Sequence, residues 1–126
     1  QRLDVYRRLQ LLENLDDYKE ISREMIDRYG RFPESVEKLL RLVEIKTICK
    51  KLHIIKVYVF NGDIRLDVEK TTPISLEKIT DIFETGFIFI SEYCLGLNLK
   101  RKNWKEDMLS IAGHLKVLLR LVNNEK

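Results

Sequence analysis

Apolar residues in the first half of the chain recur every three or four positions, a spacing typical of helices that bury one face. This pattern predicts helices over Arg2–Glu13, Leu15–Tyr29 and Glu34–Leu52. In the second helix the buried stripe is expected to consist of Tyr18, Ile21, Met25 and Tyr29, with Ile26 beside it. Gly30 can adopt the left-handed conformation that ends a helix, and Pro33 suits the start of the next one.

The middle of the chain changes to a strand pattern. Ile54–Phe60 is rich in β-branched and aromatic residues, and apolar and charged residues alternate between Ile64 and Val68. Asn61 and Gly62 between them suit the two positive φ angles of a type I′ turn. The sequence therefore predicts a β-hairpin.

The second half of the chain repeats the mixture of helix and strand. Ser75 can cap a short helix that runs from Leu76 and ends at Gly86. Two further strands are expected over Phe87–Ser91 and Leu95–Leu99, and the four apolar residues Phe87–Ile90 indicate that the first of them is buried. The last helix carries its apolar stripe on Trp104, Met108, Ile111, Leu115, Leu118, Leu119 and Val122.

Together these elements predict an α+β fold. The N-terminal helices and a long C-terminal helix are expected to pack with a small, mainly antiparallel sheet of three or four strands. At 126 residues the chain suits a single domain over 1–126, and since it begins with Gln1 we expect it to be a fragment of a longer protein.

Acidic residues gather on the second helix although the chain has a net charge of +3. Opposite the apolar stripe lie Glu20, Glu24 and Asp27. Asp27 stands in the last turn, where the helix dipole disfavours an anion. Two interpretations stay open, an ordinary solvated face and a contact surface for a basic partner.

Catalytic and membrane signals are absent from the sequence. There is no Gly-rich phosphate loop, no nucleophile elbow and no metal-ligand spacing around His53 or His114, so we expect no enzyme activity and no cofactor. No apolar run approaches the roughly 20 residues that span a bilayer, and we expect a cytoplasmic protein without membrane contact. Cys49 and Cys94 are expected to be free thiols, buried or half-buried.

Three motifs in the first half carry a family resemblance. They are RLDVYRR at Arg2–Arg8, EISREMIDRYGRFP at Glu20–Pro33 and LHI at Leu52–Ile54, the last following a leucine-rich helix. This arrangement resembles the C-terminal domain of the bacterial transcription-repair coupling factor. One departure is His53, which stands where the family usually has Gly, and which tolerates the left-handed region better than most residues.

The resemblance implies a regulatory role. In the family this domain packs on an N-terminal module that resembles excinuclease B, and it covers the surface that recruits excinuclease A. Carried over by motif position, the docking residues are Glu24 and Asp27, with Glu20 on the same stripe. The parent protein is expected to be an ATP-dependent DNA translocase that engages RNA polymerase and DNA.

Two alternatives use other parts of the chain. The basic cluster Lys100–Lys105 surrounds Trp104 and could bind a nucleic acid by gripping phosphates and stacking a base. Trp104, however, is in register with Met108 and is expected to be the first core residue of the last helix, which disfavours direct nucleic-acid binding. The other alternative is a dimerisation or scaffold domain that uses the long last helix.

Overall fold

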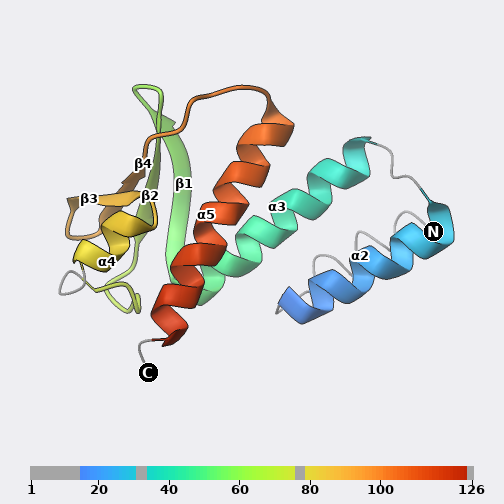
Figure 1. Cartoon of the computed structure of the whole chain (residues 1–126), viewed down its shortest axis with the longest axis horizontal. Helices are drawn as coiled ribbons and strands as arrows, with labels where there is room; N and C mark the ends of the chain where they lie inside the picture. Colours follow the sequence, from blue (N-terminus) through green and yellow to red (C-terminus); the bar gives the residue numbers. More distant parts are fainter. Residues whose placement is uncertain (1–14, 31–33, 76–78, 125–126) are drawn as a thin grey trace.

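The structure is a computed structural model that describes residues 15–30, 34–75 and 79–124 (Figure 1). In chain order the elements are α2 (Leu15–Tyr29), α3 (Glu34–Lys51), β1 (Ile54–Phe60), β2 (Asp63–Val68), α4 (Ile79–Glu84), β3 (Phe87–Ser91), β4 (Cys94–Leu97) and α5 (Trp104–Asn124). The α+β fold is confirmed, and the sheet has four strands. The helix predicted over Arg2–Glu13 lies outside the described residues.

The sheet is antiparallel throughout, with the strand order β1-β2-β4-β3. Its first hairpin turns at Asn61 and Gly62, whose φ angles of 50° and 82° confirm the predicted turn type. Helix α4 precedes β3, and the short β3–β4 connection then places β4 against β2. As a result β1 and β3 are the two edge strands.

Helices cover one face of this sheet. Leu66 and Leu95 are paired in register on that face and are fully buried against α3 and α5. On the opposite face Ile88 and Ile90 are each 45% exposed, so the prediction that β3 is a buried strand was wrong. The reason lies in how the sheet is covered, because among the described residues the helices pack only on the inner face. Strand β3 buries Phe87 on that face, while its alternate side chains face outward.

Helix α3 connects two separate apolar clusters. Its C-terminal half places Ile48 in the main core with the sheet, α4 and α5, and Leu52, directly after the helix, joins it there; both are fully buried. Its N-terminal half packs Val36 and Leu40 against α2 in a smaller cluster. The α2 members of this smaller cluster are Tyr18, Ile21 and Met25, which confirms those three positions of the predicted stripe. Ile26 lies beside the stripe and is exposed.

Two predicted left-handed helix ends are present. Gly30 has a φ of 67°, and its N–H donates to the Ile26 carbonyl at 2.8 Å. His53 has a φ of 56° directly after α3, and its Nδ1 lies 2.7 Å from the hydroxyl of Thr71. The left-handed conformation expected at His53 is thereby confirmed, with a side-chain contact that glycine could not make.

The start of α5 is fixed by two side chains. Asn103 Oδ1 accepts a hydrogen bond from the Glu106 N–H at 2.9 Å, as an N-cap does. The Asp107 carboxylate accepts from the Lys102 N–H at 3.0 Å and from Arg101 Nε at 2.9 Å. These bonds, the one from Arg101 first, hold the pKa of Asp107 below its ordinary value and anchor the loop that leads into the helix.

Candidate functional site

The acidic stripe of α2, defined as Glu20, Glu24 and Asp27, points away from the apolar cluster that holds the helix. Glu20 and Asp27 are exposed, and the Glu24 side chain is 39% exposed. Glu24 Oε1 lies 4.0 Å from Arg28 Nη1, whose side chain is itself 64% exposed. Asp27 forms no ion pair with any described residue. The stripe is therefore accessible to a basic partner.

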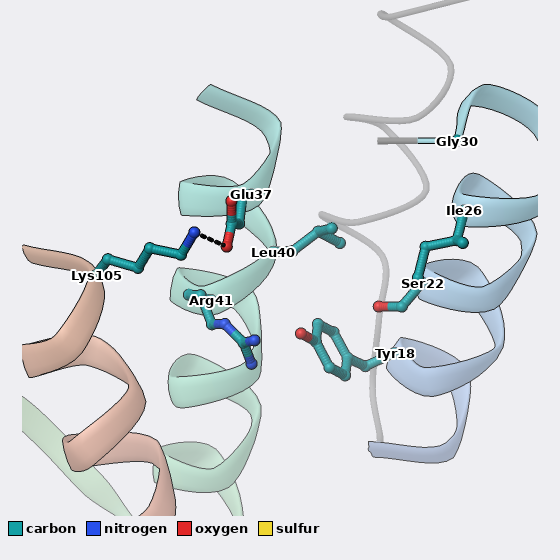
Figure 2. Close-up of a pocket in the computed structure, with 8 residues that line it drawn as sticks. All are labelled: Tyr18, Ser22, Ile26, Gly30, Glu37, Leu40, Arg41 and Lys105. Atoms are coloured by element: carbon teal, nitrogen blue, oxygen red, sulfur yellow. Dashed lines mark ion pairs between the residues drawn. The ribbon is translucent and has the colours of Figure 1, made fainter. Parts of the chain in front are cut away.

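Helix α2 packs on α3 over a small area. A cleft of about 390 Å³ opens between α2, α3 and the start of α5. Figure 2 shows Tyr18 and Ser22 of α2 pointing across it toward Leu40 and Arg41 of α3. Burial, and then the charge of Glu44, raise the pKa of Tyr18, so its hydroxyl stays protonated.

The basic cluster at Lys100–Lys105 is partly neutralised within the fold. Lys105 Nζ lies 3.0 Å from Glu37 Oε1, and Arg101 pairs with Asp107 at 2.9 Å. The indole N–H of Trp104 donates to Glu34 at 3.1 Å, and Lys38 Nζ sits 5.5 Å from the ring centroid. Only Lys100 and Lys102 of this cluster keep exposed side chains without a described carboxylate partner.

Trp104 itself lies outside the two buried clusters. The side chain is half-buried and covers the N-terminal end of α3. The expectation that it would be the first core residue of α5 was wrong, because the apolar stripe of that helix enters the main core only further along, at Leu115, Leu118 and Leu119. Stacking of a base on Trp104 would have to compete with Lys38 and Glu34.

The sequence profile of the TRCF domain matches residues 1–79, which include the whole acidic stripe. This chain belongs to the TRCF domain family. Transcription-repair-coupling factors are among its relatives. The protein from Helicobacter pylori (strain J99) is 35% identical over 88 residues, a match that covers 67% of this chain and 9% of the relative. The protein from Rickettsia bellii is 32% identical over 105 residues, covering 81% of this chain and 8% of the relative.

A solved structure shares the fold of this TRCF domain. The crystal structure of the C-terminal domain of transcription-repair coupling factor superposes with a TM-score of 0.77 at 21% identity, covering 100% of this chain and 84% of that one. The chain spans less than a tenth of the length of the full-length relatives it matches. The family match and the shared fold thus confirm the family resemblance that the motifs between Arg2 and Ile54 indicated.

The two thiols of this TRCF domain are free, as expected, with Cys49 buried and Cys94 half-buried. Burial raises the pKa of Cys49 to about 11, and it also raises the pKa of Cys94. Neither thiol is activated as a nucleophile would be. Among the described residues no group of three His, Cys, Asp or Glu side chains could hold a metal ion, and no helix is long and apolar enough to cross a membrane.

Sequence reasoning missed the polar contacts between α3 and α5 in this TRCF domain. Glu44 is 3% exposed and lies between Arg41 and Lys116. A signal for it exists in the sequence, since Glu44 falls four residues after Leu40 and four before Ile48, in line with the apolar stripe of α3. A carboxylate at such a position needs a partner from another element.

Proposed function

We propose that this chain is a non-catalytic regulatory domain of a transcription-repair coupling factor, which docks through the acidic stripe of α2. The partner is an arginine-bearing surface on the N-terminal, excinuclease-B-like module of the same protein. In the docked state the domain masks the surface that recruits excinuclease A. Engagement of the translocase with RNA polymerase and DNA releases it.

The observation that carries the proposal is the two-sided construction of α2. Tyr18, Ile21 and Met25 hold the helix on α3, and the opposite side presents Glu20 and Asp27 to solvent. The ion pair between Glu24 and Arg28 on this stripe is long and exposed. An arginine from a partner could displace Arg28 at little cost, because exposed pairs within one helix are worth only about 0.3–0.5 kcal/mol.

For the masking to be reversible, the docking contact must be weak. Exposed ion pairs contribute about 0.2–1 kcal/mol each, so the three carboxylates of the stripe can favour a closed state that a modest competing interaction opens. A ligand that releases the domain must bind the undocked state of the protein better than the docked state. A stripe of exposed carboxylates suits this requirement better than a large apolar interface would.

The test is a titration of this domain against the N-terminal module of its own full-length protein in trans. Wild type is compared with the double change Glu24→Lys and Asp27→Lys at low and moderate salt. The matched control is Glu84→Lys with Glu92→Lys, which makes the same charge change at two exposed positions on α4 and the β3–β4 turn, at the far end of the molecule from α2 (Figure 1).

Saturable binding that the α2 double change abolishes, that the control keeps and that salt weakens would support docking through this helix. Equal loss in both double variants would indicate a nonspecific charge effect and contradict the proposed site. Absence of binding by wild type at high micromolar concentration would refute the proposal. A DNA titration would then examine the exposed Lys100 and Lys102, and measurement of the mass by sedimentation over a range of concentrations would examine dimerisation.

A further inference from the structure

Strand β1 is an edge strand whose protection is limited to an irregularity between Ile54 and Lys56 and the charge of Lys56. It pairs only with β2, so one side of its backbone has no strand partner among the described residues. Ile55 is 62% exposed, Val59 is 52% exposed and Val57 is 36% exposed. Edge strands with exposed apolar side chains readily pair with another strand, and folded proteins normally blunt them. An edge with this much exposed apolar surface indicates a binding role.

The inner side of β1 borders a groove. Val57 and Val59 are in register with Leu66 and Ile64, which places them on the face of the sheet where the helices pack. Both side chains are nevertheless exposed, and a groove of about 700 Å³ lies between α3 and this strand. The apolar lining consists of Leu42, Ile45 and Cys49 from α3 and Ile54, Ile55 and Val57 from β1.

Positive charge surrounds this groove. Lys46 and Lys50 come from successive turns of α3 and Lys56 comes from β1, while Glu69 is the one carboxylate among the lining residues. None of the three lysines forms an ion pair with a described residue. Lys56 Nζ instead lies 5.0 Å from the centroid of the Tyr58 ring. An occupant with carboxylates would meet unpaired ammonium groups.

We infer that this groove binds an extended protein segment in which apolar residues alternate with aspartate or glutamate. The segment adds to β1 as a further strand, so its backbone pairs with the free edge, while its side chains alternate between the two sides of the extended sheet. The apolar side chains of the segment face the groove beside Leu42 and Ile55. Its carboxylates lie on the opposite side of the sheet, which Lys56 shares with its partner Asp67, while Lys46 and Lys50 attract the acidic segment over a longer distance.

A second copy of this chain fits the same edge less well. Pairing of two β1 strands would bring the lysines of both grooves together, and like charges placed opposite each other destabilise a strand pair. The charge of the groove therefore favours an acidic segment over self-association. The groove has no lining residue from α2, so this inference is independent of docking through the acidic stripe.

The experiment uses a fluorescein-labelled synthetic peptide, acetyl-Glu-Val-Asp-Ile-Glu-Val-Asp-Ser-amide, titrated with the whole chain by anisotropy. Amide hydrogen exchange of β1 is measured with and without the unlabelled peptide. A peptide of the same composition with its acids and apolar residues in separate blocks is the first control, and one with lysine in place of each acid is the second. Strand addition predicts saturable binding of the alternating acidic peptide and slower exchange in β1.

Two variants locate the site. Lys46→Glu with Lys50→Glu reverses two exposed charges beside the groove and should weaken binding severalfold, since two longer-range attractions become repulsions. Ile55→Asp places a like charge at a position that is 62% exposed and should weaken binding without unfolding the chain. Lys19→Glu with Arg23→Glu on α2 is the matched control, with the same spacing and exposure, and should bind as wild type does.

Any of four results would overturn the inference. These are absence of binding at about 1 mM protein, where even millimolar affinity is detectable, equal binding of either control peptide, equal weakening by the α2 control, and unchanged exchange in β1 when peptide is bound. A mass that doubles with concentration and is reduced by Ile55→Asp would assign the edge to a second copy instead.

Discussion

Lys116 Nζ lies 2.8 Å from Glu44 Oε2, and this ion pair joins the middle of α5 to the middle of α3. Arg41 approaches the other carboxylate oxygen at 3.3 Å. The carboxylate is 4% exposed, whereas Lys116 is 40% exposed. Glu44 is thus a buried anion that contacts two cations, Arg41 and Lys116, both of which reach solvent.

Removal of the lysine should cost more than neutralisation of the acid. We expect Lys116→Met to lower the free energy of unfolding by about 1–3 kcal/mol, because the buried carboxylate of Glu44 loses its closest partner. Glu44→Gln should cost less, since the buried group is then neutral. Urea unfolding of both variants and of the double variant measures this order, and a larger loss for Glu44→Gln would contradict it.

His53 offers a direct measure of backbone strain. Its φ of 56° is costly for any residue with a Cβ. His53→Gly and His53→Ala both remove the imidazole contact with Thr71, so the difference between them isolates the conformational term. We expect the glycine variant to be more stable than the alanine variant by about 1 kcal/mol in chemical unfolding. Equal stabilities would show that the chain relaxes out of the left-handed conformation.

Two glycines should respond to alanine in opposite directions. Gly86 has a φ of 95°, and a Cβ there would lie 2.9 Å from His114 Cδ2, so Gly86→Ala should destabilise by about 1–3 kcal/mol. Gly113 lies within α5 with nothing within 4 Å of an added Cβ, and Gly113→Ala should stabilise by about 0.5–1 kcal/mol. Thermal unfolding of each variant, compared with wild type, shows whether the variant is less stable or more stable.

Cys49 should be inert near neutral pH. Burial raises the pKa of its thiol from 9.0 to about 11, so the folded state holds the proton more tightly than the unfolded state. The resulting stability is complete below pH 9 and is lost as the pH rises through about 11. Alkylation of Cys49 by iodoacetamide, followed by mass spectrometry, should be slow in the native protein and fast in urea. Rapid native alkylation would contradict this burial.

Helix α2 should open before the rest of the structure. Its cluster with α3 contains only five buried side chains among the described residues, and a cleft of about 390 Å³ opens beside two of them, Tyr18 and Leu40. We expect faster amide exchange in α2 than in β2 or α5, and Met25→Ala should speed exchange in α2 with little change in β2. Exchange measured by mass spectrometry would refute this if Met25→Ala accelerated both regions equally.

Local patterns in the sequence were sufficient to predict much of this fold. Asn61 and Gly62 specified their turn through backbone conformation alone, and the spacing of Tyr18, Ile21 and Met25 specified the buried side of α2. Both rest on neighbours within one or two turns of the chain. The exposure of Glu20 and Asp27 followed from the same helical geometry.

Features that depend on distant partners could not be predicted in this way. Trp104 meets Glu34, which is 70 residues earlier, and the exposure of Ile90 depends on which face of the sheet the helices cover. The groove beside β1 has the same origin, because Lys46 and Lys56 become neighbours only when α3 is placed along the strand. Periodicity reports which side of an element is buried, but not what lies opposite it.

The division of α3 between two apolar clusters has a consequence for how this domain can vary. The helix has 18 residues, and each cluster uses a different part of it, with Leu40 serving one and Ile48 the other. Substitutions in the sheet and in α5 can therefore accumulate without altering the geometry that supports the acidic stripe. The match to the TRCF domain ends at residue 79, before β3, β4 and α5. One helix thus separates the packing that supports α2 from the packing of the sheet, so that a change in one cluster need not disturb the other.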